Sequence, residues 1–87
     1  MPYVVVRARA QDYAQWQRVF QEGVSMRREM GIKSEQVYRN PDDPNEGVVL
    51  FEVDDTQRGL QAMQAPQAQE ARRRAGLSDV KFYVPAE

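Results

Sequence analysis

The stretch Gly47–Val53, which reads GVVLFEV, decides the fold. Successive side chains of a β-strand point to opposite faces of the sheet, and here both faces receive valine, leucine or phenylalanine. This pattern predicts a central strand with apolar contacts on each side. The preceding segment Asn40–Asn45, which reads NPDDPN, combines prolines with short polar side chains and predicts a turn.

Toward the N-terminus, Ile32–Arg39 predicts a second strand, and its polarity places it near an edge of the sheet. Before this strand the apolar residues recur at helical spacing from Tyr13 onward, and Gly31 predicts the end of that helix. Asp12 is a typical N-cap, and Gln15 stands three residues later, where it would complete a capping box. The apolar stripe of this helix consists of Tyr13, Trp16, Phe20 and Val24.

The remaining elements complete the pattern at the two ends of the chain. Tyr3–Arg9 predicts the first strand, with one face that consists of Val4, Val6 and Ala8 and a second face that carries Arg7 and Arg9. After Val53, either Asp54 or Asp55 caps a second helix, which Pro66 interrupts and which ends at Gly76. Asp79–Val84 predicts the last strand. The order βαββαβ defines a single ferredoxin-like domain over residues 1–87, of the α+β class, with an antiparallel sheet.

Composition excludes several kinds of chemistry. The chain has no cysteine and no histidine, so disulfides, thiolate or imidazole metal ligands and imidazole general bases are excluded. A net charge of −1 argues against a nucleic-acid surface. The acidic pair Asp42-Asp43 lies in the turn without the spacing of a calcium loop, so we expect no metal site. We also expect no membrane span and no signal peptide, and therefore a cytoplasmic protein.

The apolar character of both sheet faces predicts a partner. The two helices of a ferredoxin-like unit cover one face of the sheet, and an exposed second face is normally polar. Val4–Val6 and Val48–Phe51 instead offer apolar side chains to both faces. A second copy packed sheet against sheet would cover the open face, which predicts a homodimer. The alternative is a monomer with some exposed valine, which proteins tolerate.

Several segments of the chain carry a family resemblance that covers essentially its whole length. They are Asp12–Trp16 with Phe20, Met26-Arg27, Gly31, Arg39–Asn45, the strand to Val53, Asp54-Asp55 and Ala75-Gly76. In these segments the chain resembles the antibiotic-biosynthesis-monooxygenase-like superfamily, and within it small uncharacterised cyclase-like proteins. The resemblance implies a dimeric α/β barrel, in which two sheets face each other, and a ligand cavity between each sheet and its helices. Members of this superfamily include cofactor-independent oxygenases of aromatic polyketides and quinols, haem-degrading enzymes and lactone isomerases. We expect no cofactor here, because the chain has no histidine, no cysteine and no cofactor motif.

Arg27 is the most informative candidate for ligand binding. Its helical position places it on the stripe of apolar residues, where a buried guanidinium needs a partner. It would anchor an anionic or phenolic ligand, form an internal ion pair with Glu52 or Asp54, or extend past Met30 to solvent. Trp16 and Tyr13 are candidates for an aromatic pocket wall, or for plain core, and the Tyr38 hydroxyl is a candidate hydrogen-bond donor to a ligand. Arg7 and Arg9 are expected to pair with carboxylates across the dimer.

These features predict a protein that binds a small aromatic or polyketide-like molecule and that acts, if it is an enzyme, as a cofactor-independent monooxygenase or cyclase. No residue is assigned a catalytic role, because no nucleophile or acid–base pair is evident. The alternative is a non-enzymatic dimeric interaction or ligand-binding module whose core is closed by aromatic side chains. An RNA-recognition module shares the βαββαβ order, but its third strand needs a basic residue and stacking aromatic residues. The corresponding strand here carries Glu46, Val48 and Leu50.

Overall fold

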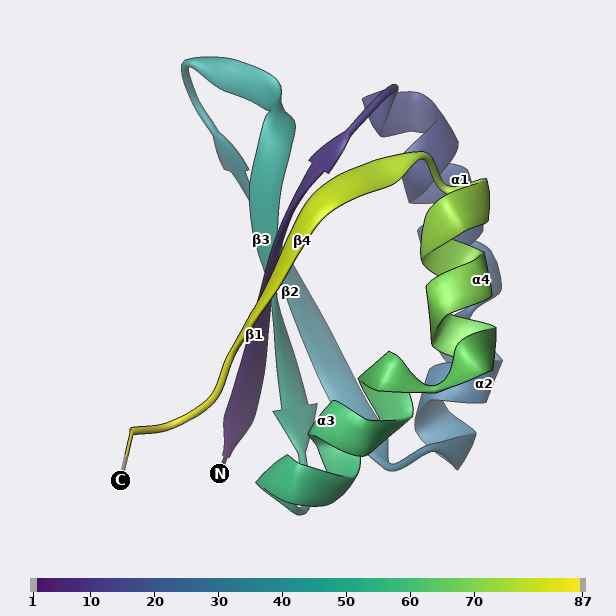
Figure 1. The fold of residues 1–87 in the computed structure, drawn as a ribbon, viewed down its shortest axis with the longest axis vertical. Helices are drawn as coiled ribbons and strands as arrows, with labels where there is room; N and C mark the ends of the chain where they lie inside the picture. Colours follow the sequence, from purple (N-terminus) through teal and green to yellow (C-terminus); the bar gives the residue numbers. More distant parts are fainter. Residues whose placement is uncertain (1, 87) are drawn as a thin grey trace.

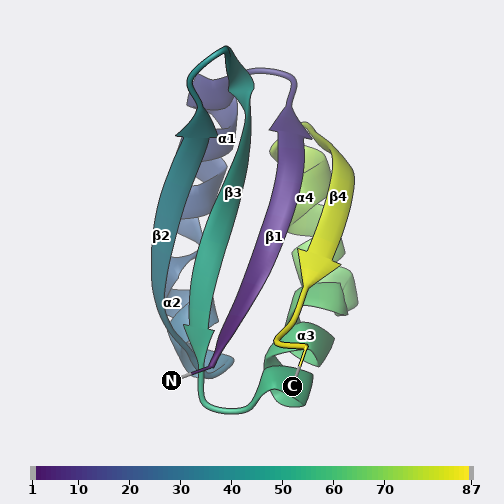
Figure 2. The same cartoon turned by 90° about the vertical axis from the view of Figure 1, so that its left-hand side faces the viewer.

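Four antiparallel strands form one sheet in the computed structural model, which describes residues 2–86, and the helices lie on one face of that sheet (Figures 1 and 2). The elements are β1 (Tyr3–Ala10), α1 (Tyr13–Glu22), α2 (Val24–Glu29), β2 (Ile32–Asn40), β3 (Asp43–Val53), α3 (Thr56–Gln64), α4 (Pro66–Arg74) and β4 (Leu77–Tyr83). The strand order is β2-β3-β1-β4. This arrangement confirms the predicted ferredoxin-like α+β fold, with β2 at an edge and β3 and β1 in the centre.

The register of the sheet separates a buried face from an open one. Val6 lies opposite Val49 and Val4 opposite Phe51, and these side chains are buried beneath the helices. Val5 and Leu50, one residue further along each strand, lie opposite each other on the other face. Figure 2 shows this second face, with α1 and α2 behind β2 and β3, and α3 and α4 behind β1 and β4. The described chain has no element that covers the open face.

The hairpin between β2 and β3 is tighter than the sequence predicted. The predicted turn over Asn40–Asn45 is wrong in its second half, because β3 begins at Asp43 and the turn contains only Pro41 and Asp42. The Asn40 side chain stabilises this turn by accepting a hydrogen bond from the Asp42 backbone N–H. Pro44 is tolerated within a strand because the pairing register with β2 shifts at this point, so its missing N–H interrupts no regular ladder.

The predicted helix from Tyr13 to Gly31 is divided in two at Gly23. The Gly23 N–H donates to the Phe20 carbonyl oxygen at 3.2 Å, a tighter turn than that of an α-helix, and a new helix starts at Val24. The apolar stripe therefore ends at Phe20, and Val24 is 38 % exposed. Gly31 ends the second helix as predicted, in the left-handed region with φ of +87°.

The helix caps agree in part with the predictions. The Asp12 carboxylate accepts a hydrogen bond from the Ala14 backbone N–H and so caps α1 as expected. The predicted capping box is not formed, since Gln15 donates its side-chain N–H to the Arg74 carbonyl oxygen and thereby links α1 to the end of α4. Asp55, and not Asp54, caps α3. Pro66 starts α4 at a position where a helix needs no N–H.

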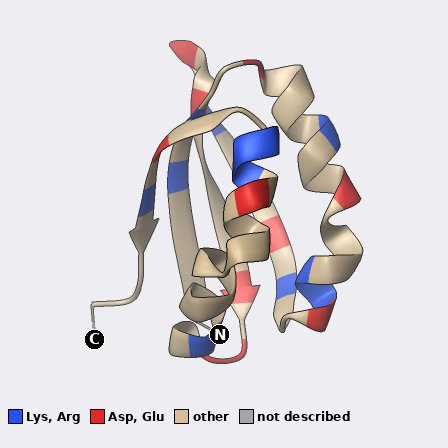
Figure 3. Cartoon of the chain, turned by 45° about the vertical axis from the view of Figure 1, so that its right-hand side comes forward, with Lys and Arg blue, Asp and Glu red and all other residues tan. Residues whose placement is uncertain are grey.

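Charges of both signs are spread over the helices (Figure 3). The last turn of α4 is the most basic helical segment, with Arg72, Arg73 and Arg74 in succession. Two of these arginines have acidic partners: Arg73 pairs with Glu70, and Arg74 pairs with Glu22 of α1. Across residues 2–86, no helix is long and apolar enough to cross a membrane.

Candidate functional site

A cavity of about 170 Å³ lies between the helices and the buried face of the sheet. Side chains from α1, α2, α4 and strands β1, β2 and β3 line it, and its walls are mostly apolar. An engineered apolar cavity of roughly this size binds benzene. The volume therefore suits a compact aromatic ligand.

A ladder of three aromatic rings on α1 forms one wall of the cavity. The ring centroids of Tyr13 and Trp16 are 5.3 Å apart, and those of Trp16 and Phe20 are 4.8 Å apart with the planes nearly parallel. We call Tyr13, Trp16 and Phe20 the aromatic ladder. The predicted wall residues Tyr13 and Trp16 thus lie together. Trp16 is also 8 % exposed, so it serves the core and the cavity at once.

Arg27 on α2 lies at the Phe20 end of this ladder. Its guanidinium carbon is 4.0 Å from the centroid of the Phe20 ring, and its Nε donates to the Glu35 carboxylate at 2.8 Å. The side chain is 14 % exposed and lines the cavity. Its Nη2 atom is buried and has no hydrogen-bond partner. A buried, unsatisfied N–H of a cation is costly, and an anion in the cavity would satisfy it.

The internal partner of Arg27 is not one of the two acids predicted from the sequence. Glu52 accepts from Ser34 and Asp54 pairs with Lys33, so the expected pairing with Glu52 or Asp54 is wrong. The cause is an irregularity near the start of β2, where the register shifts between Ile32 and Ser34. The shift turns Glu35, which lies opposite Phe51, toward the helices.

Glu35 is held by two arginines. Arg28 donates to both carboxylate oxygens, at 2.6 and 3.1 Å, and Arg27 donates to one of them. The pKa of Glu35 is held below its usual range. The hydrogen bonds from Arg28 are the largest cause of this shift, the hydrogen bond from Arg27 adds to it, and burial opposes it. Glu35 therefore remains ionised at neutral pH, where it positions Arg27 and does not act as a proton acceptor.

Sequence reasoning missed Arg39, which lies at the other end of the aromatic ladder. Its guanidinium carbon is 3.8 Å from the centroid of the Tyr13 ring, and its Nε donates to the Pro44 carbonyl oxygen at 3.1 Å. Arg39 follows Val37 and Glu35 on the helix-facing side of β2 and lines the cavity. Alternate residues of β2 share one face, and this alternation was the signal in the sequence that could have identified Arg39. It identifies the face that lines the cavity only once the irregularity at the start of β2 is known.

Arg72 of α4 is a third arginine that lines the cavity. It lies 5.2 Å from the centroid of the Phe82 ring, and burial lowers its pKa from the usual value. Within residues 2–86, no carboxylate forms an ion pair with it. The cavity walls are therefore mostly apolar, and three arginines give the cavity a positive potential: Arg27, Arg39 and Arg72.

Tyr38, the fourth predicted ligand-binding residue, is also among the residues that line the cavity. Strand alternation, however, turns its ring to the open face of the sheet, away from the aromatic ladder. The side chain is 54 % exposed, and its hydroxyl donates to the Gln36 side-chain oxygen at 3.2 Å.

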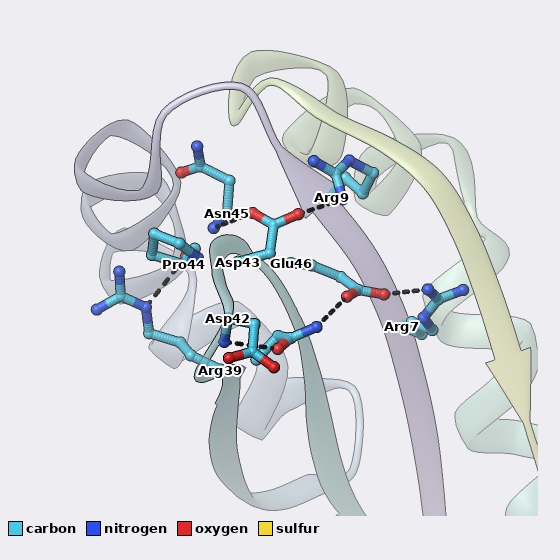
Figure 4. Close-up of polar contacts among 9 residues, drawn as sticks. Arg7, Arg9, Arg39, Asp42, Asp43, Pro44, Asn45 and Glu46 are labelled. Atoms are coloured by element: carbon cyan, nitrogen blue, oxygen red, sulfur yellow. Dashed lines mark hydrogen bonds and ion pairs between the residues drawn. The ribbon is translucent and has the colours of Figure 1, made fainter.

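A separate network of charges occupies one end of the open face (Figure 4). Arg7 pairs with Glu46, and Arg9 pairs with Asp43 at 2.7 Å. Both arginines thus have partners on β3 of the same chain, and their predicted pairing across a dimer stays a prediction. The Asp43 carboxylate also accepts a hydrogen bond from the Asn45 backbone N–H, next to the turn. Within residues 2–86, no three acidic side chains gather in a way that would hold a metal ion.

The backbone fold of this chain is similar to that of solved structures that include a cofactor-independent oxygenase and an antibiotic biosynthesis monooxygenase. No protein-family model matches the chain, and no curated protein is similar to it in sequence. The likeness therefore lies in the backbone.

Three solved structures illustrate this likeness. SnoaB from Streptomyces nogalater, a cofactor-independent oxygenase, superposes with a TM-score of 0.77 at 17 % identity, over 99 % of this chain and 91 % of its own. An antibiotic biosynthesis monooxygenase superposes with a TM-score of 0.73 at 13 % identity, over 100 % of this chain and 98 % of its own. A protein from Bordetella bronchiseptica that is proposed to be such a monooxygenase has a TM-score of 0.76 at 10 % identity, over the same shares. At these identities the comparisons show the shared fold.

Proposed function

We propose that this protein binds a small, flat, anionic aromatic molecule, of the phenolic or polyketide-like kind, in the cavity beside the aromatic ladder. The observation that carries the proposal is the Arg27 guanidinium: its side chain lines an apolar cavity, and its buried Nη2 atom has no hydrogen-bond partner. An aromatic ring would pack against Trp16 and Phe20. A phenolate, enolate or carboxylate oxygen of that molecule would accept the free N–H of Arg27.

We further propose that the reaction, if the bound molecule is transformed, is a cofactor-independent oxygenation or cyclisation. In such an oxygenation the enolate of the substrate reacts directly with oxygen, and the protein must hold the anion and exclude water. The site contains a cation with a free N–H, which would hold the anion, and apolar walls, which would exclude water. The fold shared with a cofactor-independent oxygenase supports the same reaction class.

The competing proposal is a ligand-binding module that performs no chemistry. It is favoured by the lack of a free proton acceptor: of the described side chains that line the cavity, the only carboxylate is that of Glu46, which Arg7 and Asn40 hold. A binding module whose core is closed by aromatic side chains is disfavoured, because Trp16, Phe20 and Phe51 do not fill the cavity.

Oxygen uptake with anthrone separates the two proposals. Anthrone and one molecule of oxygen give anthraquinone and one molecule of water, and the reaction proceeds through the anthrone enolate. An oxygenase should accelerate oxygen uptake above the buffer rate, and Arg27→Met should lose most of that acceleration. Arg28→Met is the matched control, since Arg28 shares Glu35 but lies outside the cavity. If oxygen uptake stays at the buffer rate and the protein still binds an aromatic acid, the oxygenase proposal fails and the binding module is supported.

We also propose that two copies associate through their open sheet faces. The support is the apolar character of that face, where Val5 and Leu50 lie among three tyrosines that are 39 to 54 % exposed: Tyr3, Tyr38 and Tyr83. Contiguous exposed apolar side chains of this kind mark protein–protein interaction surfaces. Native mass spectrometry should find twice the chain mass, and a charged substitution at the centre of the face, Leu50→Lys, should shift it to the monomer. We expect this dimer to work in the cytoplasm.

A further inference from the structure

The aromatic ladder has an arginine at each end, and the two arginines are placed in the same way. The guanidinium carbon of Arg27 lies 4.0 Å from the centroid of the Phe20 ring, and its Nε binds Glu35. The guanidinium carbon of Arg39 lies 3.8 Å from the centroid of the Tyr13 ring. The Nε of Arg39 binds the Pro44 carbonyl oxygen (Figure 4). In both cases a ring and one hydrogen bond position the guanidinium, while terminal N–H groups are left for another acceptor.

The two cations differ in what balances their charge. Arg27 shares the negative charge of Glu35 with Arg28. Arg39 has a carbonyl partner, and no carboxylate of residues 2–86 forms an ion pair with it. Seven residues separate Tyr13 from Phe20 along α1, which places the two ends of the ladder about 10 Å apart. An aromatic molecule that spans the ladder would thus meet one cation at each end.

We infer that the cavity is built for an elongated aromatic dianion, whose two acidic groups lie at opposite ends of a flat ring system. One acidic group binds Arg27 at the buried end, and the other binds Arg39 at the more exposed end. This inference rests on the proposed function, because it uses the Arg27 site and adds a second one. Arg39 then discriminates between ligands: it distinguishes molecules that carry a second anion at the far end from those that do not.

Arg72 is the alternative cation for the second acidic group. It also lines the cavity and has no carboxylate partner within residues 2–86. However, it contacts Phe82, which belongs to β4 and not to the aromatic ladder. A flat molecule packed along the ladder would point its far end at Arg39. The test below therefore includes variants of both arginines.

The experiment compares three aromatic acids by calorimetry on the full chain. 2-Naphthoate carries one carboxylate, naphthalene-2,6-dicarboxylate carries two at opposite ends, and naphthalene-2,3-dicarboxylate carries two at the same end. We expect the 2,6-diacid to bind about tenfold more tightly than 2-naphthoate. This gain lies between the contribution of an exposed ion pair and that of a fully desolvated one. The 2,3-diacid should lack this gain. Quenching of Trp16, the only tryptophan of the sequence, verifies that binding occurs at the ladder.

Variants locate the second subsite. Arg39→Met keeps an apolar contact over Tyr13 and should reduce the affinity for the 2,6-diacid to that for 2-naphthoate, while the affinity for 2-naphthoate itself stays the same. Arg18→Met removes the same charge from an exposed site of α1 outside the cavity and should change neither affinity. Arg39→Lys should retain part of the gain. A merely structural role of Arg39 would lower both affinities together.

Three results would overturn the inference, and they are distinguishable. If 2-naphthoate binds through Arg27 but the 2,6-diacid binds no more tightly, the second subsite is absent and the proposed function stands. If Arg72→Met and not Arg39→Met removes the gain, the second acidic group binds elsewhere. If neither acid binds in a manner that depends on Arg27, the proposed function and this inference fail together.

Discussion

The substitution Glu35→Gln tests how the protein positions Arg27. It keeps the shape of the side chain but removes the charge that two arginines share, and it leaves the largely buried guanidinium of Arg27 without a counterion. The hydrogen bond from Arg27 joins two side chains that are 14 % and 12 % exposed, so it is worth about 1.5 to 3 kcal/mol. The Arg28 contribution is smaller, roughly 0.2 to 1 kcal/mol, because that side chain is 42 % exposed.

The expected loss is therefore about 2 to 3 kcal/mol in the free energy of unfolding at neutral pH. For a domain of this length it corresponds to a fall of roughly 10 to 20 °C in the midpoint of thermal unfolding. Urea unfolding followed by circular dichroism measures the free energy directly. Variant and wild type should be compared at one protein concentration, since association would stabilise both.

The pH dependence makes this test specific. The pKa of Glu35 is lower in the folded chain than in the unfolded chain, so its ion pairs stabilise the fold fully above the unfolded value of about 4.3. This contribution is lost as the pH falls through the lower, folded-state pKa. The stability difference between wild type and Glu35→Gln should thus be constant near neutral pH and shrink below about pH 4. A difference under about 0.5 kcal/mol at neutral pH, or one that does not change with pH, would refute the reasoning.

Two further substitutions test the helices that carry the site. Gly23→Ala would place a Cβ atom 3.0 Å from Nη1 of Arg27, so the guanidinium must shift by a few tenths of an ångström. Calorimetry with 2-naphthoate should show a loss of about 1 kcal/mol in binding. Stability should not fall, because alanine adopts the φ of −87° at this position without strain. Unchanged affinity would mean that Arg27 adapts freely or binds no ligand. Asp55→Ala should cost about 1 kcal/mol of stability in urea unfolding, because the cap of α3 is lost. Asp54→Ala, which removes only a surface ion pair, should cost less, and equal losses would contradict the assignment of the cap.

The fold was predictable because its signals are local. The alternation in Gly47–Val53, the cap at Asp12 and the terminating glycines Gly31 and Gly76 each act within a few residues. Some of the predictions failed because the structure depends on contacts that are distant in sequence. Gln15, for example, bonds to Arg74 at the far end of the chain and not to its own helix.

The candidate site was predictable only in part, and for the same reason. Arg27 and Trp16 stand out because a cation and a large ring occupy one apolar stripe. The partner Glu35 and the second arginine Arg39 depend on the register shift near Ser34, which decides the side of β2 that faces the cavity. A one-residue shift exchanges the two faces of a strand, and no local pattern in this polar strand reveals it.

The central claim is that Arg27 anchors an anionic aromatic molecule, and the most direct measurement is the affinity of 2-naphthoate for three chains. The account predicts that Arg27→Met weakens binding about tenfold or more, because a charge-assisted hydrogen bond inside an apolar cavity is lost. Arg28→Met, which also loses its ion pair with Glu35 but does not line the cavity, should bind as wild type does. Thermal unfolding of the same samples verifies that each variant is folded. Equal affinity of wild type and a folded Arg27→Met chain would contradict the account.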